Sequence, residues 1–116
     1  MSNLDKLIKL YSRGKKLTCI TAYDASFAKY LDKSNIDIIL VGDSLGQVIK
    51  GDKSTHNVIL DEIIYHSKCV KSGLNKSIMM VDLPKKTYSN KIQAYKNINK
   101  VINVCGADIV KLEIDN

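Results

Sequence analysis

Short apolar segments alternate with amphipathic segments along this chain, and that alternation restricts the possible folds more than any other feature. Apolar runs without polar alternation are typical of buried strands, and four occur, over residues 17–23, 36–41, 77–81 and 108–112. A segment with helical spacing of apolar residues separates each strand from the next. Because strands joined by helices run parallel and are covered by those helices, the order predicts an α/β fold.

The predicted helices cover residues 3–11, 25–33, 60–71 and 90–105, and a long polar loop covers 42–57. Asp24 and Ser89 stand where helix N-caps are expected, and Gly73 and Gly106 where helices end. We expect the second, third and fourth helices to bury apolar stripes, which are Phe27, Ala28 and Leu31; Ile63, Ile64 and Val70; and Ile92, Ile98, Val101, Ile102 and Cys105.

The fold class follows from the missing motifs as well as from the element order. No GxGxxG or GxxxxGK[ST] sequence follows a strand, so a Rossmann or P-loop nucleotide site has no support. The remaining candidate is the (β/α)8 barrel, which typically needs about 250 residues. The 116 residues therefore predict one partial domain, 1–116, forming the first half of a barrel with an N-terminal helix, four parallel strands and three intervening helices.

Composition favours some partners over others. The net charge is +6, but only Arg13 among the 18 basic residues is arginine and the lysines are scattered, whereas nucleic-acid footprints are usually clustered. No apolar run could cross a bilayer and the start lacks a signal-peptide core. Three widely spaced cysteines fit reduced thiols. We expect no nucleic-acid or membrane partner and a cytoplasmic location.

Acidic residues follow three of the predicted strands, namely Asp43, Asp82 and Glu113. The carboxyl ends of parallel strands meet at one edge of a sheet, where α/β enzymes place their active sites. Carboxylates within roughly 10 Å of each other repel unless a cation or proton intervenes, and oxygen ligands favour Mg²⁺. Lys111 shares a strand face with Glu113, so it could hold a substrate carboxylate or enolate oxygen. The alternative is that each acidic residue only caps the following helix.

The tetrapeptide Gly42-Asp43-Ser44-Leu45 also matches the GDSL signature of serine esterases. In that family the nucleophile follows the first strand, whereas a complete strand and helix precede Ser44. Neither His56 nor His66 has Asp three residues before it, so the Asp-x-x-His partner is missing. A nucleophile without its base is weak support for covalent catalysis.

The stretch TAYDASFAKYLDKSNIDIILVGDSLGQVIKGDKST resembles the N-terminal part of ketopantoate hydroxymethyltransferases, and YHSKCV, VDLP and VKLE extend the likeness over nearly the whole chain. The resemblance implies a (β/α)8 barrel that transfers a hydroxymethyl group from 5,10-methylenetetrahydrofolate to 3-methyl-2-oxobutanoate in pantothenate and coenzyme A synthesis. It implies Mg²⁺ bound by Asp43, Asp82 and Glu113, and keto-acid contacts from Asp43, Ser44, Asp82 and Lys111.

The chain departs from the family pattern in three places. DLPKKTY replaces DLPF-x-SY, KLEIDN replaces KLEGG, and HNVI replaces LPVT. The resemblance places the general-base glutamate beyond Asn116, so no catalytic residue is expected in this chain and we expect it to be inactive or weakly active alone. The alternative is a non-catalytic Mg²⁺- and keto-acid-binding remnant, or one subunit of a split barrel. Exposed strand edges predict a homo-oligomer, and family members are decameric.

Overall fold

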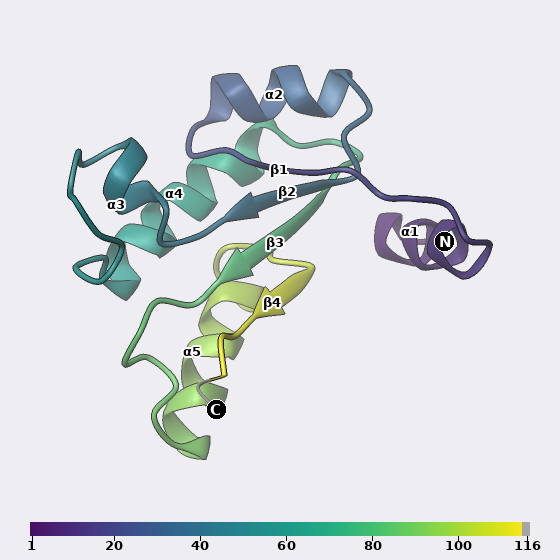
Figure 1. Ribbon diagram of the computed structural model, residues 1–116. Helices are drawn as coiled ribbons and strands as arrows, with labels where there is room; N and C mark the ends of the chain where they lie inside the picture. Colours follow the sequence, from purple (N-terminus) through teal and green to yellow (C-terminus); the bar gives the residue numbers. More distant parts are fainter. Residues whose placement is uncertain (115–116) are drawn as a thin grey trace.

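The computed structural model describes residues 1–114, and its four strands form one parallel sheet in the order β1-β2-β3-β4 (Figure 1). The strands are β1 (Cys19–Thr21), β2 (Ile38–Val41), β3 (Ile78–Asp82) and β4 (Ile109–Lys111). The helices are α1 (Asn3–Ser12), α2 (Ala25–Lys33), α3 (Leu45–Val48), α4 (Leu60–Gly73) and α5 (Lys91–Asn103). The predicted α/β order is confirmed, although β1, β2 and β4 are shorter than predicted and β3 is shifted by one residue. Asp115 and Asn116, which end the predicted domain, lie outside the described residues.

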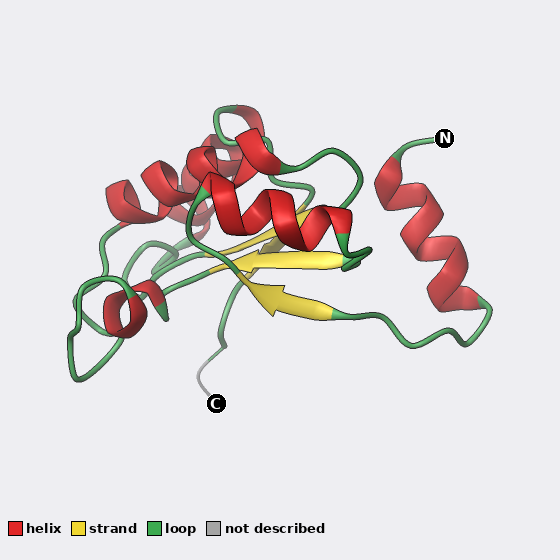
Figure 2. Cartoon of the chain, turned by 90° about the horizontal axis from the view of Figure 1, so that it is seen from above, coloured by secondary structure: helices red, strands yellow, loops and turns green. Residues whose placement is uncertain are grey.

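The main core lies between one face of the sheet and helices α2, α4 and α5 (Figure 2). Ile39, Val41, Met79 and Val81 point into this core and are fully buried. Helix α1 lies apart from the other helices, beside the starts of the strands, where Leu7 packs with Ile38 and Ile78. Because side chains alternate along a strand, the remaining positions of β3 and β4 face away from the main core. No helix within residues 1–114 is both long and apolar enough to cross a bilayer.

The predicted apolar stripes are correct at their centres and wrong at their edges. Asp24 caps α2 through the Phe27 backbone N–H and Ala28 is fully buried, but Phe27 is 66% exposed. In α5, Val101 is buried whereas Ile92 is 83% and Ile102 40% exposed, and Cys105, which was predicted to belong to this helix, is buried just after its end. Both helices contact the core along a narrow stripe, so apolar residues one position off the stripe remain in solvent.

Two details of the predicted boundaries are also wrong, and a third is confirmed. Asn90, not Ser89, caps α5, because the Asn90 side chain accepts the Gln93 backbone N–H. The predicted loop 42–57 contains the short helix α3. Gly73 is the last residue of α4, as predicted, and a Cβ atom there would stand 2.4 Å from the Ala25 carbonyl oxygen. Glycine is needed there because α2 and α4 approach so closely.

Asp32 accepts hydrogen bonds from the backbone of the segment that leads into β3. Its side chain is buried and Oδ1 accepts the backbone N–H groups of Ser77 at 2.7 Å and Lys76 at 2.9 Å. Burial by itself would raise the pKa of Asp32, but these hydrogen bonds outweigh it and lower the pKa. The ionised carboxylate therefore stabilises the fold above the ordinary aspartate pKa, and that stability is lost as the pH falls through the lower folded value.

We expect Asp32→Asn to lower the free energy of unfolding by about 2 kcal/mol at neutral pH, since hydrogen bonds to a charged group are replaced by weaker neutral ones. The difference should shrink below about pH 4, where the wild-type carboxyl is increasingly protonated in the unfolded chain. Urea denaturation of both proteins at several pH values measures it. A loss that does not depend on pH would contradict the role given to the charge.

Candidate functional site

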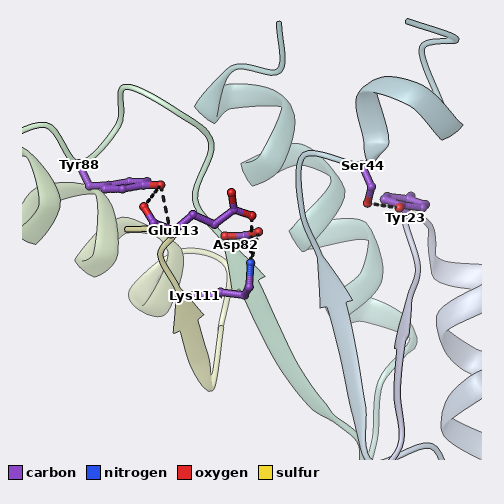
Figure 3. Close-up of polar contacts among 6 residues, drawn as sticks. All are labelled: Tyr23, Ser44, Asp82, Tyr88, Lys111 and Glu113. Atoms are coloured by element: carbon purple, nitrogen blue, oxygen red, sulfur yellow. Dashed lines mark hydrogen bonds and ion pairs between the residues drawn. The ribbon is translucent and has the colours of Figure 1, made fainter. Parts of the chain in front are cut away.

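Asp82 and Lys111 meet at the carboxyl ends of β3 and β4, as their positions on the strands predict. They are direct partners in the parallel register, which places them side by side on the sheet face away from the main core. The Lys111 Nζ atom lies 2.9 Å from Asp82 Oδ2 and 3.2 Å from Glu113 Oε1 (Figure 3). The lysine therefore holds two of the three predicted carboxylates in one cluster, which confirms the predicted common face of Lys111 and Glu113.

Only one of the two Asp82 carboxylate oxygens has a hydrogen-bond partner among the described residues. Its side chain is 8% exposed, Oδ2 binds Lys111, and Oδ1 is buried with no hydrogen-bond partner within the described residues. Burial raises the pKa of Asp82 against the opposing effect of Lys111, and the charges of Glu113 and Asp43 raise it further. The more exposed Lys111 has its pKa raised, mainly by its hydrogen bond to Asp82. An ionised Asp82 would gain from a cation at Oδ1.

Gly42 makes room for this carboxylate at the end of β2. A Cβ atom on Gly42 would lie 3.2 Å from Asp82 Cβ and 3.6 Å from Oδ2. Val41 pairs with Val81 in the β2–β3 register, so Gly42 lies level with Asp82 and Asp43 lies one residue beyond it. Asp43 is half-buried. Within residues 1–114 no group of three or more acidic, histidine or cysteine side chains is arranged to hold a metal ion. Asp43, Asp82 and Glu113 lie near one another without forming a ready-made metal site. Their assignment as metal ligands stays a prediction.

Ser44 lies on the other side of the site and bonds to Tyr23, the last residue of the first predicted strand. Its Oγ shares a hydrogen bond with the Tyr23 hydroxyl (Figure 3). His66 Nδ1 lies 2.7 Å from the Tyr23 carbonyl oxygen, and because a carbonyl only accepts, Nδ1 carries the hydrogen. His66 thus anchors Tyr23 and does not contact Ser44, so no serine–histidine pair supports the esterase interpretation.

Tyr88 is a residue whose role the sequence did not indicate. Its hydroxyl donates to the Glu113 carbonyl at 2.9 Å and accepts the Glu113 N–H at 3.2 Å. These bonds fix the backbone of Glu113 although its side chain is exposed. Tyr88 lies in the loop between β3 and α5, and no periodicity in the sequence points from that loop to the end of β4.

The donor set suits a hard divalent cation. Asp82 Oδ1 has no hydrogen-bond partner in the described part of the chain, and Asp82 Oδ2 and Glu113 Oε1 converge on one ammonium group. Asp43 is close enough for its charge to act on Asp82. Oxygen atoms of this kind are the ligands that Mg²⁺ prefers, and Mg²⁺ usually needs only one or two carboxylates together with substrate and water oxygens. The residues present therefore fit Mg²⁺ with a chelating substrate.

Two solved structures superimpose on this chain. Phosphonopyruvate hydrolase, crystallised in complex with oxalate and Mg²⁺, matches with a TM-score of 0.81 at 13% sequence identity, over 100% of this chain and 40% of its own. Oxaloacetate acetylhydrolase matches with a TM-score of 0.74 at 14% identity, over 96% and 39%. At these identities the likeness shows the fold alone, and it confirms that the sheet is part of a (β/α)8 barrel.

Sequence comparison is more specific. The chain is 45% identical over 111 residues to 3-methyl-2-oxobutanoate hydroxymethyltransferase of Ruthia magnifica subsp. Calyptogena magnifica, covering 96% of this chain and 42% of the relative. It is 48% identical over 103 residues to the enzyme of that name from Clostridium botulinum (strain Alaska E43 / Type E3), covering 88% and 38%. The chain spans about 40% of the length of these relatives. A model of the ketopantoate hydroxymethyltransferase family matches residues 2–116, and the chain therefore belongs to that family.

Proposed function

We propose that this chain supplies the Mg²⁺- and keto-acid-binding part of a hydroxymethyltransferase that converts 3-methyl-2-oxobutanoate to 2-dehydropantoate with 5,10-methylenetetrahydrofolate. The observation that carries the proposal is the cluster of Asp82, Lys111 and Glu113, in which a buried carboxylate oxygen has no hydrogen-bond partner among residues 1–114. Family membership supports the reaction class, because the relatives are named for this transfer. The ligands would be Asp43, Asp82 and Glu113.

When bound, Mg²⁺ would withdraw electron density from the keto group of the substrate and so acidify the proton on C3. The protein side chains have separate tasks. The Lys111 ammonium group lies where it can bind an anionic substrate oxygen, and its raised pKa keeps it charged at neutral pH. Ser44, oriented by the Tyr23 hydroxyl, can donate a hydrogen bond to the keto-acid carboxylate. Asp82 holds Lys111 in place.

Loss of the C3 proton needs a general base, and the resemblance puts that glutamate in the part of the relatives that this chain does not cover. We propose that residues 1–116 bind the keto acid without rapid turnover. The alternative is one subunit of a split barrel, in which the edge strands β1 and β4 would pair with strands of a second polypeptide. Further expectations are a homo-oligomeric state and, from three free cysteines, a cytoplasmic location.

The test is an assay of the purified chain for 2-dehydropantoate, supplied with Mg²⁺, 3-methyl-2-oxobutanoate and methylenetetrahydrofolate. We expect turnover below about one thousandth of typical enzyme values of about 10 per second, because loss of a catalytic base commonly costs 10²–10⁴-fold. Addition of a polypeptide carrying the remaining part of a relative should restore product if the chain is a split-barrel subunit. Rapid turnover by the chain alone would contradict the proposed absence of the base.

A further inference from the structure

The chain carries a cation of its own among the carboxylates proposed to bind Mg²⁺. The Lys111 ammonium nitrogen lies 2.9 Å from Asp82 Oδ2 and 3.2 Å from Glu113 Oε1 (Figure 3). Within residues 1–114 no other basic side chain forms an ion pair with Asp43, Asp82 or Glu113. A divalent cation that binds these carboxylates therefore meets one positive charge that already holds two of them.

The charge of this cluster sets how strongly it attracts a cation. Three ionised carboxylates and one ammonium group leave a net charge of −1, whereas the same carboxylates without Lys111 would present −3. Like charges repel most strongly where water is partly excluded, as it is around the buried Asp82. Lys111 therefore lowers the attraction of the site for Mg²⁺, and an anion that draws the ammonium group away would restore it.

The exposure of its partners shows which of the two ion pairs of Lys111 can open. The Asp82 side chain is 8% exposed, and the Leu83 N–H donates to the Lys111 carbonyl at 3.1 Å, which fixes the two strands beside it. The side chains of Glu113 and Lys111 are 59% and 40% exposed. Tyr88 bonds to the backbone of Glu113 and leaves its carboxylate free to turn. The flexible stem of the lysine can thus carry the ammonium group from Glu113 to a ligand while the strands stay in place.

We propose that Lys111 and Mg²⁺ compete for Asp82 and Glu113, and that the keto acid ends this competition by binding the ammonium group with its own anionic oxygen. The identity of the anion rests on the proposed function, whereas the competition rests on the two ion pairs. Mg²⁺ and the keto acid should each bind more tightly in the presence of the other, because coupling between two ligands is reciprocal. The lysine thus makes the site accept metal and substrate as a pair.

A lysine with a purely structural role leads to the opposite expectation. If Lys111 only kept the carboxylates from repelling one another, its removal would let them spread apart and would weaken Mg²⁺ binding. If Lys111 competes with the metal, its removal strengthens Mg²⁺ binding. The direction of the change in Mg²⁺ affinity therefore decides between the two roles.

The experiment is calorimetric titration of the full chain with Mg²⁺ alone, for the wild type and for Lys111→Met, which keeps an unbranched side chain and removes the charge. We expect Lys111→Met to bind Mg²⁺ about tenfold more tightly, within the roughly 5–150-fold range of typical couplings. Lys111→Gln, which can still donate a hydrogen bond to Asp82, replaces it if circular dichroism shows that the methionine variant does not fold.

The matched control is Lys50→Met, because Lys50 also pairs with two carboxylates, Asp52 and Glu62, and neither belongs to the proposed site. It makes the same change in net charge. We expect it to change Mg²⁺ affinity less than about twofold, since charges outside the site are screened by salt.

Repeating the titration with excess 3-methyl-2-oxobutanoate measures the coupling. The keto acid should raise the Mg²⁺ affinity of the wild type about tenfold more than that of Lys111→Met, in which only chelation by the substrate remains. Mg²⁺ affinity in Lys111→Met equal to or below that of the wild type would overturn the inference, and Mg²⁺-dependent keto-acid binding by the wild type would then leave the proposed function standing. Tighter Mg²⁺ binding in Lys111→Met, without any keto-acid binding by the wild type, would instead support the competition and contradict the proposed function.

Discussion

Asp82→Asn should abolish Mg²⁺ binding while leaving the protein folded. Asparagine keeps the size of the side chain and an oxygen for Lys111, but it removes the charge that a cation needs. Mutating a group that only supports a metal ligand commonly costs 10–100-fold in affinity, so loss of a ligand itself should cost at least about 100-fold. Calorimetric titration with Mg²⁺ in the presence of 3-methyl-2-oxobutanoate measures the change.

Stability and pH distinguish this result from simple unfolding. Burial raises the pKa of Asp82, so the native state binds the proton more tightly than the unfolded chain does, and stability is lost as the pH rises from the ordinary aspartate pKa through the raised folded pKa. Relative to wild type, Asp82→Asn should therefore become more stable as the pH rises above about 4. Asp61→Asn, the same change at an exposed position of α4, should alter neither property. Wild-type Mg²⁺ affinity in Asp82→Asn would contradict the ligand assignment.

Gly73→Ala should destabilise the fold more than most single substitutions. The new Cβ atom would lie 2.4 Å from the Ala25 carbonyl oxygen and 3.0 Å from the Lys29 nitrogen, and both are backbone atoms that cannot move without shifting α2. Overpacking of this kind typically costs 1–3 kcal/mol, and contact with backbone places the expected loss at about 3 kcal/mol. That is a large part of the 5–15 kcal/mol that stabilises a typical domain.

Urea denaturation of Gly73→Ala beside Ser72→Ala provides the comparison. Ser72 is exposed on the same turn of α4, and its hydroxyl donates only to the Cys69 carbonyl, so its loss should change stability by less than about 0.5 kcal/mol. In an uncrowded helix, glycine to alanine would instead gain about 1 kcal/mol from helix propensity. A stabilised Gly73→Ala protein would show that α2 and α4 do not approach as closely as described.

The sequence predicted the order and the parallel arrangement of the strands because apolar runs and helix caps are local signals. Asp24 predicts the start of α2 correctly, since an N-cap depends on the next three residues alone. The width of each buried stripe is not local. Phe27 and Ile92 are apolar and in phase with their helices, yet they stay exposed because no neighbouring element reaches them. The close approach of Gly73 to Ala25 could not be predicted for the same reason, since the two residues are remote in sequence.

The residues of the candidate site that lie at strand ends could be predicted from the alternation of side chains along a strand. Asp82, Lys111 and Glu113 follow from strand ends and side-chain alternation, and the register places the first two side by side. The partners that orient the site were not predictable, because they come from loops. Tyr23 reaches Ser44 across 21 residues of sequence, and Tyr88 reaches Glu113 across 25. No spacing rule connects such positions.

The central claim is that the ends of β2, β3 and β4 form one Mg²⁺-dependent keto-acid site. Calorimetric titration of 3-methyl-2-oxobutanoate into the chain, with Mg²⁺ and with a chelator, tests it most directly, and Asp43→Ala tests the residue that lies furthest from the Lys111 cluster in the register. We expect binding at one site that requires Mg²⁺ and disappears in Asp43→Ala. Binding that persists with the chelator or in Asp43→Ala, or no binding to the wild type, would contradict it.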